Sequence, residues 1–462
     1  MEQTSATLKP NPGRRSPITW IPTAYFAMGL PFVVLNMVCV LMYSDLGIDT
    51  DTITFWTSLI LLPWTFKFLW SPFMEIFGTK KIYVVATQII TGATFGGVAM
   101  ALGMSDFFAI TIALLAVVAF SGATHDVACD GVYMSELSNS EQAKYIGWQG
   151  AFYNIAKIVG TGGLVYLAGI FFKSFGGNPD LSGSENYDAS QKTWILIMLI
   201  LCVIMVALGV YHIFFLPSSK KKTSGVKRSG GEVMKEFGNV LLLFFKKKYI
   251  WYYIMFIILY RFAEGFVIKI VPIFLKDSTS AGGLGLSLEN IGLYYGTCGA
   301  ATFVLGSLLA GYYISVRGLS KTLFKLALIF NLPFVVYTLF AIFQPTSGWI
   351  IAGGIGIEYF GYGFGFVGLT LFMMQQVAIG KHQMAHYAFA SGIMNFGVML
   401  PGMLSGWVLN KLGGYENFFI FVLVATVVPL LVTWFVPFKY NDDGTPIAGA
   451  VEEALTSGEG TE

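Results

Sequence analysis

Long apolar stretches, separated by short polar segments, occupy almost the whole chain. Each stretch reaches the roughly 20 residues that a helix needs to cross the hydrocarbon core of a bilayer. Strands of a transmembrane barrel would be about ten residues long with alternating polarity, and these stretches are longer and uniformly apolar. The pattern therefore predicts an all-α membrane protein with twelve transmembrane helices in two six-helix halves. The predicted spans are Ile18–Tyr43, Ile53–Met74, Ile82–Gly103, Phe107–Tyr133, Gly147–Phe172, Thr193–Leu216, Tyr249–Leu275, Leu288–Val316, Leu323–Phe343, Trp349–Met374, Ala385–Leu409 and Asn417–Pro437.

The composition supports the same class of protein. The chain of 462 residues is 55% hydrophobic and 12% charged, and that charged fraction is about half that of a soluble globular protein. The four cysteines lie inside apolar stretches without paired spacing, so neither a disulfide scaffold nor a cysteine-based zinc site is expected. We predict no metal site, no cofactor and no catalytic residue.

The lysines and arginines between the spans predict the orientation, because positive charge accumulates in cytoplasmic loops. If the N-terminus is cytoplasmic, twenty of the 28 lysines and arginines fall in inner segments. The outer segments then contain only Lys173, Lys192, Lys276 and Lys411. We therefore predict that both termini are cytoplasmic.

A basic linker, residues 217–248, divides the chain into two parts of similar length. Its clusters of lysine and arginine favour contact with anionic lipid headgroups, and a regulatory partner site is the alternative. Two halves of six spans suggest a duplicated architecture with a site between them. The predicted regions are a cytoplasmic N-terminal tail (1–17), an N-terminal six-helix bundle (18–216), the basic cytoplasmic linker (217–248), a C-terminal six-helix bundle (249–438) and a disordered cytoplasmic tail (439–462).

A weak internal repeat supports the duplication. Tyr153 and Gly160 in span five recur as Asn395 and Gly402 in span eleven, at a constant offset of 242 residues. Spans five and eleven are therefore expected to occupy equivalent places in the two halves.

The loop after span two has a recognisable pattern. A small residue, a carboxylate, a glycine and a basic pair follow one another between Ser71 and Lys81. This order resembles the loop signature of the major facilitator superfamily. Gly78 permits a tight turn, Glu75 can face a helix N-terminus of the other half, and Lys80 and Lys81 hold the turn at the headgroups. We predict a gating loop made of these four residues; a simple positively charged turn is the alternative.

A narrower resemblance covers nearly the whole membrane domain. The segments 66–75 (FKFLWSPFME), 125–131 (HDVACDG) and 260–266 (YRFAEGF) look very like the AmpG muropeptide permeases. With the acetyl-coenzyme A transporters, these form one branch of the major facilitator superfamily. The resemblance implies import of a cell-wall-derived sugar or glycopeptide by proton symport across the cell inner (plasma) membrane. The family's basic pair in span five is reduced here to Lys157, so another oligosaccharide or anionic solute stays open.

Ionisable residues inside the first six spans are candidates for function, because a charge at mid-bilayer costs at least about 2.5 kcal/mol. Asp126 and Asp130 share one face of span four, since they are four residues apart. Lys67 of span two lies at a similar depth and can pair with either acid. One interpretation is a structural ion pair; in the other, one of the acids exchanges a proton during transport.

The second half contains two further candidate acids. Arg261 and Glu264 of span seven are three residues apart and can pair, whereas Glu358 of span ten has no cation nearby in the sequence. A lone buried carboxylate stays protonated until it meets water or a cation, as a proton carrier must; a hydrogen-bonded core acid is the alternative. The predicted proton-coupling residues are Asp126, Asp130, Glu264 and Glu358, and the predicted ion-pair residues are Lys67, Lys157 and Arg261.

Polar and aromatic residues of several spans are candidates for the solute site. Aromatic faces beside amides suit sugar rings. Lys157 could meet an anionic group of the solute, or it could be a structural partner of Asp126 or Asp130. The predicted solute-binding residues are Asn36, Trp148, Gln149, Tyr153, Asn154, Lys157, Tyr362, Gln375, Gln376, His386 and Asn395.

Three classes of function fit these features. The two halves, the loop and the intramembrane acids favour a proton-coupled importer. An intramembrane acyl or glycosyl transferase could use His125 and Asp126, but the sequence has no HExxH or GxSxG motif; a sensor would act through the basic linker. The absence of a P-loop motif excludes ATP-driven transport. The expected partners are a small-molecule solute, protons and anionic lipid headgroups, with no nucleic acid, and we expect a monomer.

Overall fold

The structure is a computed structural model that describes residues 15–71, 74, 79–137, 139–178, 186–217, 230–379, 382–441 and 446–447. These residues are almost entirely helical, and their only β-structure is an isolated bridge between Tyr440 and Pro446. The prediction of an all-α fold is confirmed.

Some spans are single long helices, and others consist of shorter helical segments joined end to end. The first half contains η1 (Pro17–Thr19), α1 (Ile21–Val33), η2 (Val34–Val38), α2 (Cys39–Asp45), α3 (Thr50–Leu59), α4 (Leu62–Phe66), η3 (Lys67–Leu69), α6 (Lys80–Ala101), α7 (Phe107–Glu136), α8 (Asn139–Lys157), η4 (Ile158–Leu164), α9 (Val165–Ser174) and α10 (Tyr187–Phe215). After α11 (Gly230–Lys246), the second half contains α12 (Ile250–Tyr260), α13 (Phe262–Lys276), η5 (Thr279–Ala281), α14 (Leu288–Ile291), η6 (Gly292–Cys298), α15 (Gly299–Arg317), α16 (Leu319–Asn331), η7 (Leu332–Phe334), α17 (Val335–Phe343), α18 (Gly348–Phe372), η8 (Met373–Val377), α19 (Gln383–Leu412), α20 (Tyr415–Ala425) and α21 (Val427–Trp434).

Eleven helical stretches among the described residues are long and apolar enough to cross a membrane. They correspond to every predicted span except the seventh. That span is interrupted at Arg261, whose backbone leaves the helical region at φ −103° and ψ 16°. Within the predicted seventh span, α12 and α13, of 11 and 15 residues, follow each other across this turn.

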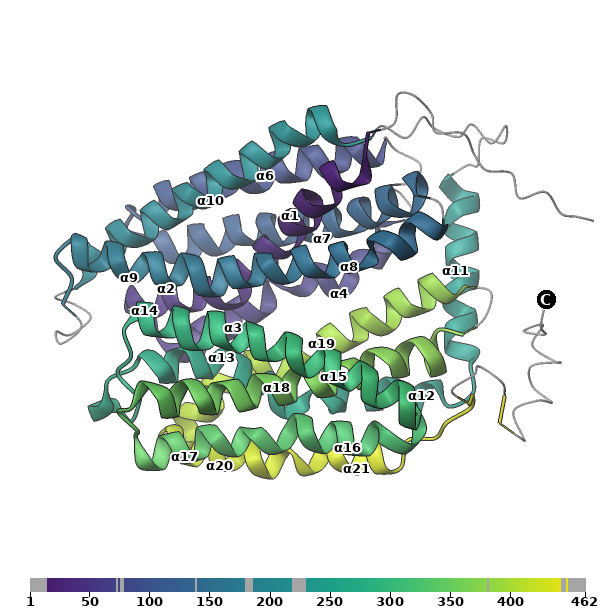
Figure 1. The fold of residues 1–462 in the computed structure, drawn as a ribbon. Helices are drawn as coiled ribbons and strands as arrows, with labels where there is room; N and C mark the ends of the chain where they lie inside the picture. The colour runs from purple at the N-terminus through teal and green to yellow at the C-terminus, as the bar shows by residue number, and fades with distance from the viewer. Residues whose placement is uncertain are drawn as a thin grey trace, which may run out of the picture.

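The two groups of helices pack in equivalent ways (Figure 1). In the first group α1 packs against α8, and in the second α13 packs against α19. Glycines make both contacts close: a Cβ on Gly29 would lie 2.9 Å from the carbonyl oxygen of Tyr153, and one on Gly265 would lie 2.9 Å from that of Val398. Spans five and eleven, which share the sequence repeat, therefore make equivalent helix contacts.

The second part of the basic linker forms a helix, whereas the sequence suggested only a solvated segment. In Figure 1 α11 runs across the ends of the long helices at one end of the molecule. It packs against α12 and α19, and Phe244 is fully buried beside Phe389, with ring centroids 5.6 Å apart. Burial of apolar side chains on one face explains why this segment is helical. Residues 218–229 lie outside the described part.

The first and last described helical segments lie at the same end of the molecule as α11. Thr19 accepts a hydrogen bond from Tyr211 near the end of α10, and Gln376 near the end of α18 and η8 binds the backbone of Tyr440. Lys247, just after α11, donates to the carbonyl oxygen of Val377. We call this the predicted cytoplasmic end, and the opposite end the predicted outer end.

Candidate functional site

The two halves meet along a surface that we call the seam, and their backbones touch where η4 crosses η6. A Cβ on Gly162 would lie 2.4 Å from Oγ1 of Thr297, and one on Gly296 would lie 2.4 Å from the carbonyl oxygen of Thr161. Both segments are π-helical, a form common at functional sites. In Figure 1 α8 and α15 diverge from this crossing toward the predicted cytoplasmic end. The crossing therefore closes the seam toward the predicted outer end.

Lys157, the last residue of α8, places its ammonium group at the seam. Its Nζ lies 5.1 Å from the ring centroid of Tyr153 in its own half and 5.2 Å from that of Phe303 in the other half. Among the described residues, no carboxylate lies within 4.0 Å of this nitrogen. The two rings stabilise the cation through cation–π contacts, but no described anion neutralises it.

Arg261 faces the same region from the second half. Its Nε donates to Oε2 of Glu264 at 2.6 Å, and its Nη2 donates to Oε1 of the same carboxylate and, at 3.2 Å, to the hydroxyl of Tyr362. The side chains of Arg261 and Glu264 are only 8% and 5% exposed. The ring of Tyr362 also contacts Phe303, with centroids 4.9 Å apart. The contacting rings of Phe303 and Tyr362 therefore link Lys157 with the Arg261–Glu264 pair.

Glu358 lies one helical turn before Tyr362 on α18, and the two side chains share a face. It is 6% exposed and accepts a hydrogen bond of 3.0 Å from the hydroxyl of Tyr337. No lysine or arginine of the described residues forms an ion pair with it. Glu358 is thus a buried acid with a hydroxyl partner, next to the residues that face the seam.

The first half holds its own pair of acids. Asp126 accepts a hydrogen bond of 2.8 Å from Trp64 and an ion-pair contact of 3.4 Å from Lys67, both on Oδ2. Its Oδ1 is buried and has no hydrogen-bond partner among the described residues. Asp130 accepts a hydrogen bond of 2.9 Å from Tyr25. The structure therefore brings Lys67 to Asp126, not to Asp130.

Replacing Lys67 with methionine should destabilise the protein, because Asp126 loses its only described cation. Breaking a buried pair costs about 3–5 kcal/mol, and we expect about 2–3 kcal/mol, since the Lys67 side chain is 25% exposed. Adding Asp126→Asn should recover most of this loss, whereas adding Asp130→Asn should not. Thermal unfolding of the purified variants in detergent measures the difference; equal recovery by both double variants would contradict the pairing.

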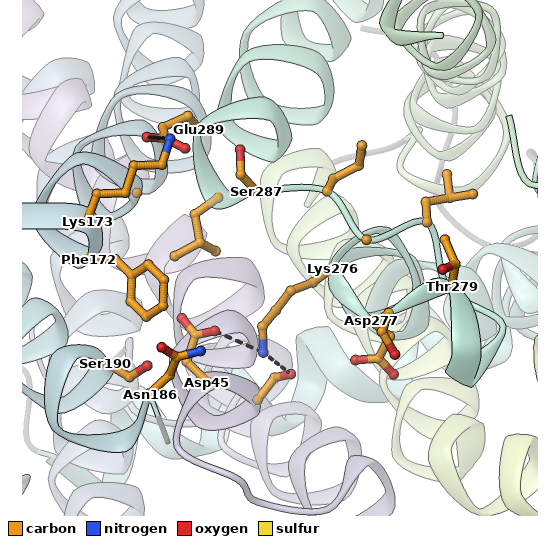
Figure 2. Close-up of a pocket in the computed structure, with 17 residues that line it drawn as sticks. Asp45, Phe172, Lys173, Asn186, Ser190, Lys276, Asp277, Thr279, Ser287 and Glu289 are labelled. Carbon is orange, nitrogen blue, oxygen red and sulfur yellow. Dashed lines mark hydrogen bonds and ion pairs between the residues drawn. The ribbon is translucent and has the colours of Figure 1, made fainter. Parts of the chain in front are cut away.

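Two ion pairs join the halves at the predicted outer end (Figure 2). Lys276 Nζ lies 2.9 Å from Oδ1 of Asp45 and donates to Ser44 at 2.9 Å. Lys173 Nζ lies 2.8 Å from Oε1 of Glu289. Both pairs line a cavity of about 550 Å³ that lies on the outer side of the η4–η6 crossing. The sequence offered a signal for these pairs, because they use two of the four lysines predicted to be outside.

Most of the other predicted solute-binding residues lie on α8 or within π-helical segments. Trp148 is 44% exposed and stacks on Phe152, with centroids 6.0 Å apart. Gln149 and Gln375 each have a buried Oε1 without a hydrogen-bond partner among the described residues. The remaining three residues, Asn36, Asn154 and Asn395, are half-buried. The side chain of Asn36 donates to the carbonyl oxygen of Phe32, and that of Asn154 donates to the carbonyl oxygen of Gly150.

Two predicted solute-binding residues make structural hydrogen bonds at the predicted cytoplasmic end. The amide of Gln376 donates to the carbonyl oxygen of Tyr440 and accepts from the backbone nitrogens of Lys439 and Tyr440. His386 is buried against α11, with Nε2 3.2 Å from the carbonyl oxygen of Val240. Both residues hold the predicted cytoplasmic end together, in contrast to the expectation that they line the solute site.

The predicted gating loop lies partly outside the described residues, which include neither Glu75 nor Gly78. Lys80 donates to the carbonyl oxygen of Gly131 at 3.0 Å, and Lys81 donates to that of Leu216 at 2.8 Å. The two lysines therefore tie the start of α6 to the ends of α7 and α10, all within the first half.

Sequence reasoning missed a buried polar chain inside the first half. Gln88 lies 3.0 Å from Nε2 of His125 and 2.8 Å from Nδ1 of His212. The other ring nitrogen of His212 lies 2.9 Å from the hydroxyl of Thr23. His212 gave no signal, because an isolated histidine in an apolar span has no motif around it.

Comparisons with known proteins agree with this architecture. A family model described as the Major Facilitator Superfamily matches residues 23–400. The anhydromuropeptide permease of Escherichia coli (strain K12) is 22% identical over 415 residues, which cover 88% of this chain and 77% of the relative. The putative transporter AmpG 1 of Rickettsia bellii is 21% identical over 386 residues, covering 81% of this chain and 87% of the relative. The resemblance inferred from the sequence is confirmed.

A solved structure has the same fold. The D-xylose-proton symporter superposes with a TM-score of 0.69 at 11% identity, covering 93% of this chain and 99% of that one. At this identity the likeness concerns the fold alone.

Proposed function

Since this chain belongs to the Major Facilitator Superfamily and is a multi-pass membrane transporter of a small molecule, we propose that it imports a cell-wall-derived sugar or glycopeptide by proton symport. The solute is a muropeptide-like molecule that binds at the seam, and the membrane is the cell inner membrane. The similarity to an anhydromuropeptide permease over 88% of the chain supports this substrate class. No enzymatic activity is proposed.

The observation that carries the proposal is the excess of positive charge at the seam. Lys157 and Arg261 lie within electrostatic range of each other and of one acid, Glu264. Among the described residues one cation therefore stays without an anion, and a carboxylate of the solute would neutralise this otherwise uncompensated charge. Tyr153, Phe303 and the half-exposed Trp148 offer aromatic faces on which sugar rings pack. An anionic sugar conjugate matches both features.

Counterflow in proteoliposomes tests the substrate class. Vesicles loaded with unlabelled solute should take up labelled anhydro-muropeptide at least tenfold faster than empty vesicles, and excess free disaccharide without a carboxylate should compete poorly. Lys157→Met should weaken competition by the muropeptide while leaving that of an uncharged disaccharide unchanged. If the disaccharide competes as well as the muropeptide, an uncharged oligosaccharide is the better candidate.

The orientation of the chain is part of the same proposal. Ser280, in the segment between α13 and α14, and Met234, on α11, are both exposed. In intact cells, a cysteine replacing Ser280 should react with an impermeant thiol reagent, and one replacing Met234 should react only after permeabilisation, because loops rich in lysine and arginine stay cytoplasmic. Cys202 and Cys298 are replaced by serine in both cases. The opposite labelling pattern would invert the topology and with it the direction of import.

A further inference from the structure

Lys269 is a fully buried lysine of α13 that the proposed solute site does not use. It is 2% exposed. Its Nζ reaches across the seam to the carbonyl oxygens of Asn36 and Thr57, at 3.3 Å each. Asn36 belongs to span one and Thr57 to span two, so this single side chain joins the second half to two helices of the first.

The helix backbone is irregular near both carbonyl groups. Thr57 lies near the end of α3, where the backbone nitrogen of Leu61 donates to Ser58 and not to Thr57. Asn36 lies in the π-helical η2, in which backbone pairing departs from the i to i+4 pattern. Carbonyl groups that a helix leaves unpaired need an external donor when they are buried.

Among the described residues, no carboxylate forms an ion pair with the Lys269 amine. The buried thiol of Cys39 lies within electrostatic range of it. A Cβ on Gly402 would lie 2.8 Å from the hydroxyl of Ser58, which is buried without a hydrogen-bond partner among the described residues, and 3.6 Å from Cγ of Lys269. An uncharged amine has two N–H donors and fits the two carbonyl oxygens, whereas an ammonium group would be buried without a counter-ion.

The acidic side chains on the elements packed against α13 are engaged elsewhere or exposed. Asp45 binds Lys276, Glu289 binds Lys173, Asp51 accepts from the backbone of Thr52, and Glu416 is exposed. On α13 itself, Glu264 binds Arg261. None of these acids forms an ion pair with Lys269.

We propose that Lys269 is the latch of the outer gate: it holds the two halves together at the outer part of the seam, which we call the outer gate. It also couples the opening of this gate to the uptake of one proton. While the gate is closed, the uncharged amine donates to Asn36 and Thr57. When the halves separate at the outer end, water reaches the amine, which takes a proton from hydronium of the outer solution, leaving a water molecule, and becomes an ammonium group that cannot return to the closed site. Closure requires the reverse step, in which the ammonium gives its proton to water.

The inference rests on the proposed proton symport, to which it adds a residue that titrates at the gate. Its consequence is a linkage: each opening event takes up one proton, so the ratio of open to closed protein should rise about tenfold for each unit of pH decrease over the titration range of the amine. A lysine that only stabilised the fold would change this ratio by a constant factor at every pH.

Distance measurements between spin labels across the outer seam test the linkage without any solute. Labels on Ser174→Cys and Ser280→Cys, two exposed positions on opposite halves, report opening in protein whose half-buried Cys202 and Cys298 are replaced by serine. The wild-type background should populate the longer distance increasingly as the pH falls from about 9 to about 5. The absence of any pH dependence would overturn the proposal.

Two variants assign the effect to Lys269. Lys269→Gln keeps two N–H donors but cannot bind a proton, so the gate should stay closed at every pH. Lys269→Met removes the donors as well, and its open fraction should also be independent of pH. The exposed Lys192→Gln is the matched control and should keep the wild-type slope. If the open fraction of Lys269→Gln depends on pH as it does in the wild type, another group binds the proton and the proposal is overturned. Since no solute is present, this outcome is independent of the counterflow result.

Discussion

Replacing Glu358 with glutamine should abolish the accumulation of solute against its gradient while leaving exchange between two loaded compartments intact. Glutamine keeps the shape of the side chain and its ability to accept from Tyr337, but it cannot release a proton. Exchange continues because the loaded carrier returns without passing through the proton-free state. We expect the accumulation ratio under an imposed pH gradient to fall to about one, and the exchange rate to change less than about threefold.

The exposed Glu416→Gln serves as the matched control, since it removes one carboxylate outside the packed core. It should accumulate solute like the wild type. Normal accumulation by Glu358→Gln, with the wild-type dependence on pH, would remove Glu358 from the coupling mechanism. Loss of exchange together with accumulation would instead make Glu358 a binding or structural residue.

Replacing Arg261 with methionine should be the most destabilising single change in the second half. It leaves the carboxylate of Glu264 buried, at 5% exposure, without its ion-pair partner. Breaking such a pair costs about 3–5 kcal/mol.

A double variant separates charge from packing. Arg261→Met combined with Glu264→Gln removes both charges and should recover most of the lost stability, measured as thermal unfolding in detergent. Arg317→Met, at an exposed position, is the control and should unfold like the wild type. A double variant as unstable as Arg261→Met would show that packing of the guanidinium, and not its pairing with Glu264, supports this part of the fold.

The sequence predicted the fold well because the bilayer imposes a simple rule: each span must be long and apolar. The same rule concealed the break in span seven, since Arg261 is one polar residue within an apolar stretch and its effect on the backbone depends on Glu264 and Tyr362. It also concealed α11, whose buried face exists only because α12 and α19 provide a surface for Phe244.

The candidate site was only partly visible in the sequence. The Arg261–Glu264 contact follows from helical spacing, and the Lys67–Asp126 contact follows from equal depth in two spans. The partners of Lys269, by contrast, are backbone carbonyl groups, which every residue has and no motif marks. Gln376 and His386 were selected for their polarity, but contacts with the chain end and with α11, far away in the sequence, determine what they bind.

Proton movement driven by the solute tests the central claim, proton symport, most directly. Proteoliposomes that enclose a pH-sensitive dye, with equal pH on both sides, are given anhydro-muropeptide outside. The downhill flow of solute should acidify the lumen, a proton ionophore should cancel the change, and Glu358→Gln should show no acidification. Entry of labelled muropeptide at the normal rate with no change in lumenal pH would contradict proton symport.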